Sequence, residues 1–117
     1  MINLWEEIIE VLEKYNKTWK DVQIIYGEDF QITKDNFEKV SKETDYDNGY
    51  GGQEVAKDLV IIGNGFVMNR EEYDGLEWWH YLHTGFDIPK EIVEIKRLCG
   101  GGWNTLKEIQ EAEYYYE

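Results

Sequence analysis

The sequence of 117 residues has little cysteine and proline: Cys99 and Pro89 are the only residues of their kinds. A lone cysteine cannot form an internal disulfide, so we expect the protein to work in a reducing cytoplasm. No apolar run approaches the roughly 20 residues that span a bilayer. The N-terminal residues also lack the basic and apolar regions of a signal peptide. These absences predict a protein without membrane association or export.

Positive charge is also scarce. The chain has 12 Lys and Arg residues against 25 Asp and Glu residues, which gives a net charge of −13. This charge disfavours direct binding to DNA, RNA or anionic membranes, because phosphate contacts require Lys and Arg. It attracts basic protein surfaces instead, including those that normally hold nucleic acid. In the alternative interpretation, the acidity serves only solubility.

Aromatic residues are plentiful in spite of the high charge. The five Trp, nine Tyr and four Phe residues favour an ordered domain, since disordered chains are poor in such side chains. The length fits one domain over residues 1–117. No internal repeat is present, so a solenoid or a second domain is not expected.

The N-terminal half predicts two helices and a hairpin. Asn3 can cap a helix over residues 4–15, whose apolar residues follow a 3.6-residue period. Two β-rich runs, 22–26 and 30–32, are separated by a turn and predict a hairpin. Thr33 can cap a short helix over residues 34–41. The glycine-rich and tyrosine-rich stretch 45–52 predicts a loop.

The C-terminal half predicts a meander and a last helix. We expect a central strand at 59–62, a return strand at 66–68, a turn at 70–75 and a third strand at 76–82. Residues 92–95 fit a strand or a helical turn, and a strand is favoured. A capping box from Thr105 to Glu108 begins a helix that runs to about residue 115. The predicted class is α+β, with a mainly antiparallel sheet of about four to six strands, an N-terminal helix, a short middle helix and a C-terminal helix.

Two groups of residues resemble metal ligands only superficially. The run from Asp45 to Gly49 alternates acidic residues as a calcium loop does, but loop positions 6 and 12 are occupied by Tyr50 and Ala56. His80 and His83 are three residues apart, which places them on opposite faces of a strand. We therefore expect no bound metal and no cofactor.

Catalytic patterns are also missing. Cys99 is isolated, and no residue pattern marks a base for it, so it is best interpreted as a small buried residue. The glycine clusters at 63–65 and 100–102 match no phosphate-binding loop and are predicted to be turns. We predict that the protein is not an enzyme.

Acidic residues alternate with aromatic ones in four segments of the chain. Trp78 and Trp79 are adjacent on a predicted strand, so one should enter the core while the other lies on the outer face, exposed or covered by the terminal helix. Exposed Trp and Tyr residues are favoured anchors at interfaces, and carboxylates around them suit a partner rich in Arg and Lys. The predicted partner-binding residues are Asp45, Tyr46, Asp47, Tyr50, Glu71, Glu72, Asp74, Glu77, Trp78, Trp79, Glu111, Glu113, Tyr114 and Tyr115.

Residues 47–51, 53–63, 72–75 and 77–79 resemble a group of small uncharacterised proteins carried by phages and prophages of Gram-positive bacteria. The resemblance extends back to the first helix and covers about two-thirds of the chain, but nothing matches from about Gly85 onward. The group is richer in Trp in the strand that here reads Phe66-Val67-Met68.

The resemblance implies a phage setting and a location in the cytoplasm of a host bacterium. Small acidic phage proteins include inhibitors of host enzymes, and some anti-CRISPR proteins present carboxylates in place of DNA phosphates. By this analogy of class, we expect an inhibitor of a nucleic-acid-handling protein such as a CRISPR effector, acting as a DNA mimic. The alternative is a structural or accessory phage protein, monomeric or self-associating as a homodimer through exposed aromatic residues.

Overall fold

Two capped helices begin the chain. The structure, a computed structural model, describes residues 1–47, 49, 52–82, 89 and 91–112. Helix α1 (Leu4–Lys14) begins where the side chain of Asn3 accepts a hydrogen bond of 3.1 Å from the N–H of Glu6. Helix α2 (Lys34–Lys42) begins in the same way at Thr33. Both caps were predicted from the sequence and are confirmed.

The main sheet is antiparallel throughout and has five strands among the described residues. Its spatial order is β3-β2-β5-β6-β7, and the single crossover brings the early hairpin beside the later meander. This arrangement confirms the predicted α+β class. The strands are β2 (Val22–Tyr26), β3 (Gln31–Ile32), β5 (Val60–Gly63), β6 (Phe66–Tyr73) and β7 (Leu76–Leu82).

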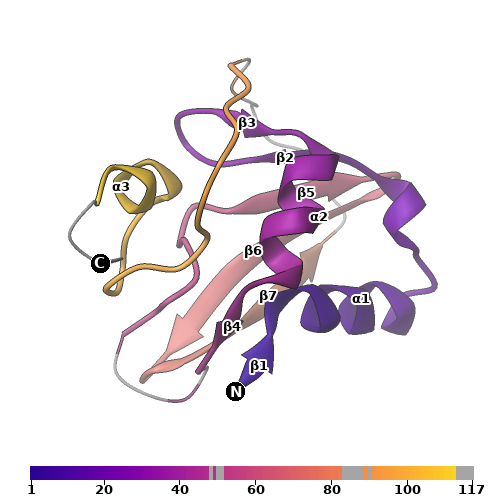
Figure 1. The fold of residues 1–117 in the computed structure, drawn as a ribbon. Coiled ribbons are helices and arrows are strands. Elements are labelled where there is room, and N and C mark those ends of the chain that lie inside the picture. The colour runs from indigo at the N-terminus through magenta and orange to yellow at the C-terminus, as the bar shows by residue number, and fades with distance from the viewer. Residues whose placement is uncertain (48, 50–51, 83–88, 90, 113–117) are drawn as a thin grey trace.

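Helices α1 and α2 lie across one face of this sheet (Figure 1). The core is the layer between them, because α1 directs Leu4, Ile8 and Leu12 inward and each of these side chains is fully buried. Strands β5 and β6 supply Ile61 and Met68 from the sheet side. The central position predicted for the apolar strand is confirmed, since two strands lie on each side of β5 in the sheet order.

Three predicted element boundaries are corrected. Residues 45 and 46 lie not in a loop but in β4 (Asp45–Tyr46), which pairs with β1 (Ile2–Asn3). Strand β6 continues through the predicted turn to Tyr73, because a two-residue turn at Asp74 and Gly75 keeps the strands paired. The predicted strand at 92–95 is a single parallel bridge between Ile92 and Gln31, since β3 is too short to pair with more.

The C-terminal helix α3 (Leu106–Glu111) has the predicted capping box between Thr105 and Glu108. It packs near the β2–β3 turn, where Leu106 donates its N–H to the carboxylate of Asp58 over 2.8 Å. The helix ends at Glu111, with Ala112 as a non-helical C-cap, so the prediction that it runs on to about residue 115 is corrected; residues 113–117 lie outside the described residues. A short 3₁₀ helix, Trp19–Asp21, connects α1 to β2. No helix within the described ranges has the length and apolar character needed to cross a bilayer.

Candidate interaction surface

The β6–β7 hairpin is the longest paired unit of the sheet, with seven consecutive residue pairs from Val67–Leu82 to Tyr73–Leu76. Its turn consists of Asp74 and Gly75, whose φ angles of 53° and 89° are both positive. Such turns match the right-handed twist of the flanking strands, and Asp and Gly are among the residues that tolerate them. The sequence therefore builds a regular two-stranded ribbon that ends in a tight corner.

The two faces of the ribbon differ sharply. On the face toward the helices, Glu77 and Trp79 are buried, with 2% and 6% of their surface exposed. On the outer face, Leu76 and Trp78 are exposed by 51% and 39%, and Tyr73 by 73%. The prediction that Trp78 and Trp79 face opposite ways is confirmed, with Trp79 in the core and Trp78 outside.

Acidic side chains lie near these exposed apolar residues: Glu71 is on the same face, Asp74 is in the turn, and Glu72, which pairs with Glu77, is on the opposite face of the ribbon. Glu72 and Asp74 are exposed, and the carboxylate of Glu71 is partly exposed beside Nδ1 of His80 at 2.8 Å. We call this group the hairpin surface; its members are Glu71, Glu72, Tyr73, Asp74, Leu76 and Trp78. Gly49 also lies close by, since a Cβ on it would be 3.8 Å from Leu76, and its N–H bonds to the carboxylate of Asp47.

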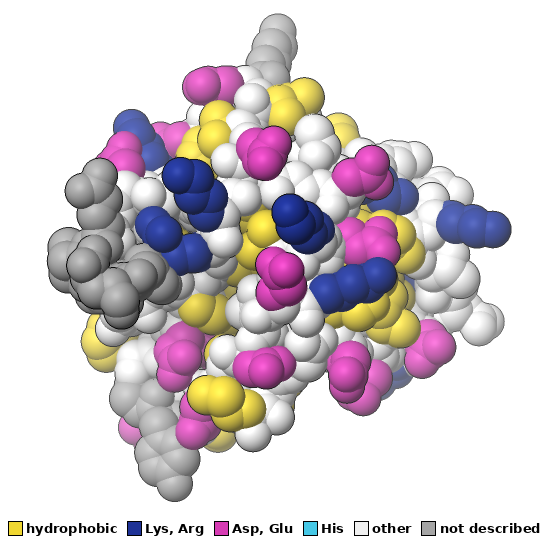
Figure 2. Space-filling view, viewed as in Figure 1, with side chains coloured by type: hydrophobic (Ala, Val, Ile, Leu, Met, Phe, Trp, Pro, Cys, Tyr) yellow, Lys and Arg dark blue, Asp and Glu magenta, His cyan; other side chains and the backbone are white. Residues whose placement is uncertain are grey.

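The hairpin surface contains no cation. Arg70 is the only Lys or Arg in residues 66–82, and its side chain is buried on the other face. Over the helices, by contrast, acidic and basic side chains are mixed (Figure 2). The potential near the hairpin is therefore negative.

A buried ionic network fixes the inner side of the hairpin. Nη2 of Arg70 lies 2.6 Å from the carboxylate of Glu77 and 3.1 Å from the hydroxyl of Tyr46, and Nη1 lies 3.3 Å from Glu7. Tyr46 in turn donates its hydroxyl to Glu7 over 2.7 Å. Burial raises the pKa of Tyr46 well above its usual value. The network ties α1, β4, β6 and β7 together, so it holds the hairpin against the helical layer.

The carboxylate of Glu77 also holds the chain segment that precedes β5. Glu77 accepts the backbone N–H groups of Glu54 at 2.6 Å and Val55 at 3.1 Å. Each of its oxygens therefore has a partner, which offsets the cost of burying the charge. The side chain is structural in this position.

The structure divides the predicted partner-binding residues into three groups. Tyr46, Glu77 and Trp79 are buried, which corrects their prediction as surface contacts. Glu71 and Trp78 share the outer face of the hairpin, Asp74 lies in its turn, and Glu72 is exposed on the opposite face near the turn. Asp47 is near the hairpin through Gly49, and Asp45 is exposed on β4 beside Asn3. Glu111 lies on α3, away from the hairpin turn in Figure 1. The remaining predictions lie outside the described residues: Tyr50, Glu113, Tyr114 and Tyr115.

Two exposed residues of the hairpin surface were not predicted. Tyr73 and Leu76 flank the turn and are the most exposed apolar residues of the hairpin. The period-2 pattern of residues 76–82 could have found Leu76, since it must share a face with Trp78. Tyr73 was missed because residues 70–75 were predicted to form a turn.

Glu111 belongs to a different feature, a groove of about 460 Å³ between α3 and the β2–β3 turn. Asp29 and Glu91 also line it, together with Lys107, Phe30 and Val93. Among the described residues that line the groove, Lys107 is the one cation, and with the apolar Phe30 and Val93 it makes a mixed surface. It lacks the exposed aromatic rings of the hairpin surface.

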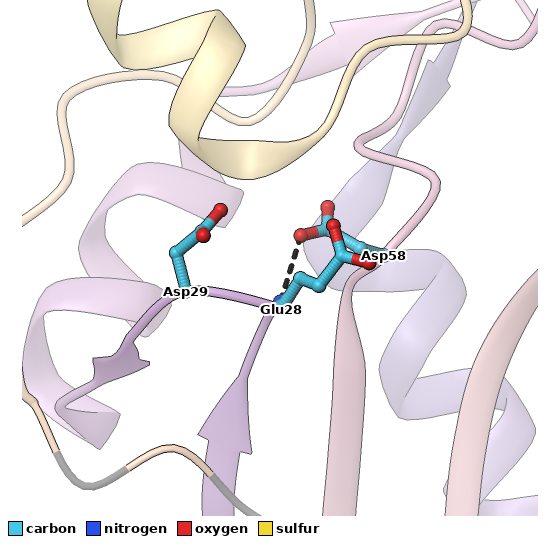
Figure 3. Close-up of side chains that lie close together, drawn as sticks. All are labelled: Glu28, Asp29 and Asp58. Atoms are coloured by element: carbon cyan, nitrogen blue, oxygen red, sulfur yellow. Dashed lines mark hydrogen bonds between the residues drawn. The ribbon is translucent and has the colours of Figure 1, made fainter.

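Three carboxylates gather next to this groove: Glu28, Asp29 and Asp58 (Figure 3). They are the one group of metal-ligating side chains that the described part of the chain brings within 4.8 Å of one another. Asp58 accepts the N–H groups of Glu28 and Leu106, so both of its oxygens already join the turn to α3. These bonds give the cluster a structural role.

The lone cysteine has the properties of a core thiol. Burial, assisted by nearby carboxylates, raises the pKa of Cys99 to about 12. The thiolate is the reactive form of cysteine, and it is scarce at neutral pH when the pKa is this high. His83, which sequence analysis considered together with His80, lies outside the described residues.

No protein-family model, no curated protein and no solved structure matches this chain. The assignment of the hairpin surface therefore depends on the geometry of its own residues.

Proposed function

We propose that the protein acts by binding, without catalysing a reaction, and that the hairpin surface docks onto a basic surface of another protein. The observation that carries the proposal is the exposure of Tyr73, Leu76 and Trp78 close to the carboxylates of Glu71 and Asp74. Large apolar side chains that are exposed in the free protein gain free energy when a partner buries them, and they are the usual anchors of an interface. Carboxylates around them favour a partner rich in Arg and Lys.

The partner class follows from the charge. A surface that holds nucleic acid is rich in Lys and Arg, because phosphate contacts use these side chains, so it has the charge that an acidic protein requires. We therefore propose that the protein inhibits a nucleic-acid-handling protein of a bacterial host by occupying its nucleic-acid site. The expected phage setting supports, by analogy of class, a role like that of anti-CRISPR proteins that mimic DNA, with a CRISPR effector as one partner of the required chemistry.

Self-association through the same residues is the alternative function. The exposed rings favour it, but two copies would also bring Glu71, Glu72 and Asp74 against the same charges of the partner copy. Like charges in close contact oppose association. A rise in sedimentation coefficient with concentration, lost in Trp78→Ala, would support this alternative over inhibition.

In the test, the wild-type protein is immobilised on a resin and incubated with a lysate of a Gram-positive bacterium at low salt. Bound proteins are then eluted with salt. Two variants are run beside it: Trp78→Ala/Glu72→Gln/Asp74→Asn on the hairpin surface, and Glu10→Gln/Glu13→Gln on the exposed side of α1. We expect a nucleic-acid-binding protein that is retained by the wild type and the α1 variant and lost by the hairpin variant. The purified partner should then release its DNA or RNA when the wild type is added.

Three results would overturn the proposal. One is equal retention by the wild type and the hairpin variant. Another is a partner that keeps its nucleic acid in the presence of excess protein. The third is affinity that stays constant from low to high ionic strength, because contacts between exposed charges must weaken as salt screens them.

A further inference from the structure

The inner face of the hairpin already contains one site for a guanidinium group. Arg70 lies directly across the ribbon from Trp79, with its Cζ atom 4.8 Å from the centre of a Trp79 ring and 5.4 Å from that of Tyr46. The carboxylate of Glu77 accepts its Nη2 over 2.6 Å. Two aromatic rings and a carboxylate thus hold one arginine.

The outer face repeats these components without the arginine. Trp78 lies directly across from Glu71, and Tyr73 is the next residue of β6 on that face. Directly opposite residues in such a pair have Cβ atoms about 5 Å apart, and diagonal ones about 7–8 Å. Trp78 and Tyr73 are in the diagonal relation, a separation that aromatic side chains can bridge, so their rings can contact one flat group next to the Glu71 carboxylate.

The binding capacity of this arrangement is unused. Trp5, Trp19 and Trp79 each have a cation of this chain over their rings: Lys42, Lys34 and Arg70. In the described part of the chain, Trp78 and Tyr73 have neither a cation nor another aromatic ring against them. Glu71 contacts His80 through Oε1, and its Oε2 has no partner within the same residues.

We infer that Trp78, Tyr73 and Glu71 form a seat for an arginine side chain of the partner. The inference rests on the proposed function and specifies which basic residue the hairpin surface recognises. A guanidinium is planar, is weakly hydrated and stacks on aromatic faces while its N–H groups pair with a carboxylate. A lysine ammonium carries the same charge but is compact and strongly hydrated, so it gains less from this geometry.

The probes are hexa-arginine and hexa-lysine peptides, which carry the same charge. Binding to the full-length protein is measured by calorimetry and by the indole N–H signals in ¹H–¹⁵N spectra, with Trp78→Phe identifying the Trp78 signal. We expect hexa-arginine to bind about two- to five-fold more tightly than hexa-lysine, the range for an exposed cation–π contact. The Trp78 signal should shift with hexa-arginine more than the other indole signals do.

The variants separate the seat from general charge attraction. Trp78→Leu keeps an apolar side chain and should bring the two affinities to equality, with hexa-lysine binding unchanged. Glu71→Gln should reduce the preference for arginine, whereas Glu13→Gln removes the same charge from α1 and should keep it. Equal affinities in the wild type, or a preference for arginine that survives in Trp78→Leu, would overturn the seat.

The experiments distinguish a failure of the arginine seat from a failure of the proposed function. If the protein displaces nucleic acid from the lysate partner but the two peptides bind equally, the hairpin surface docks without selecting arginine. If the peptides show the arginine preference but no nucleic-acid-binding partner depends on the hairpin surface, the seat exists and the proposed inhibition is wrong.

Discussion

Nη2 of Arg70 lies 2.6 Å from Oε1 of Glu77, and neither side chain exposes any surface to solvent. The pair lies directly beneath the hairpin surface and joins β6 to β7 on their inner side. Removing one partner of a buried ion pair leaves the other charge uncompensated, which costs far more than the loss of an exposed pair.

We therefore predict that Arg70→Met lowers the free energy of unfolding by about 3–5 kcal/mol. Urea unfolding followed by circular dichroism at pH 7 measures this change. The matched control is Lys42→Met, which removes the exposed pair of Lys42 with Glu38 on α2 and should cost at most about 1 kcal/mol. Equal losses in the two variants would show that the buried pair does not stabilise the fold.

The double variant Arg70→Met/Glu77→Leu should recover only part of the loss. It removes both buried charges, but it also leaves the N–H groups of Glu54 and Val55 without the carboxylate that they bond. Each unsatisfied buried N–H costs about 1–3 kcal/mol. Full recovery of wild-type stability would contradict this role of Glu77.

Truncation of the two adjacent tryptophans should lower the free energy of unfolding by very different amounts. Trp79→Ala removes a ring that is 6% exposed and packs over Arg70, so we predict a loss of about 3–5 kcal/mol in unfolding free energy. Trp78→Ala removes a ring on the outer face and should cost less than about 1 kcal/mol. Thermal unfolding of both variants measures the difference. A Trp78→Ala variant as unstable as Trp79→Ala would mean that Trp78 supports the core rather than the surface.

This pair also marks how far the sequence alone could predict the site. The period of 2 in a strand determines that Trp78 and Trp79 face opposite sides, but it does not say which side is the core. That choice depends on where α1 and α2 pack, which is a property of the whole fold. The alternation of acidic and aromatic residues singled out Glu71, Glu72, Asp74 and Trp78, which the fold brings to the end of one hairpin; their role in binding stays a prediction.

The buried residues Tyr46 and Glu77 could not be recognised as such. A polar side chain is normally expected at the surface, and it is buried only when partners satisfy it. The partners of Tyr46, Glu7 and Arg70, are 39 and 24 positions away in the sequence, and no local pattern predicts that they meet. Arg70 and Glu77 are only seven residues apart, but the predicted turn at 70–75 placed Arg70 outside the strand. The two-residue strand β4 was missed for a related reason, because its pairing with β1 is a long-range contact without a periodic signal.

The corner of the hairpin depends on Gly75, whose φ is 89°. A side chain in this left-handed region is strained, so Gly75→Ala should lower the free energy of unfolding by about 1–2 kcal/mol. The control is Gly49→Ala, where a Cβ meets only ordinary contacts at 3.8 Å, and its effect should stay within about 0.5 kcal/mol. Urea unfolding compares the two. Because the turn sets the register of Tyr73 and Leu76, Gly75→Ala should also weaken hexa-arginine binding, while Gly49→Ala should not.

Stability should also depend on the ionisation of Glu54. Burial, followed by the charges of Glu77 and Asp47, raises the pKa of this carboxyl above its usual value. A carboxyl with a raised pKa ionises less readily in the folded protein than in the unfolded chain. Its ionisation therefore destabilises the fold at neutral pH, and this penalty disappears as the pH falls below the pKa of the unfolded chain, about 4.3.

We accordingly predict that Glu54→Gln raises the melting temperature at pH 7. Gln keeps the shape of the side chain and removes the charge that its neighbours disfavour. The gain should shrink as the pH falls through the carboxyl range and vanish near pH 4, where wild-type Glu54 is protonated in the folded protein. Glu13→Gln removes an equal charge from the exposed side of α1 and should give a smaller gain at pH 7. Destabilisation by Glu54→Gln at pH 7, or a gain that persists undiminished in acid, would contradict the repulsion among Glu54, Glu77 and Asp47.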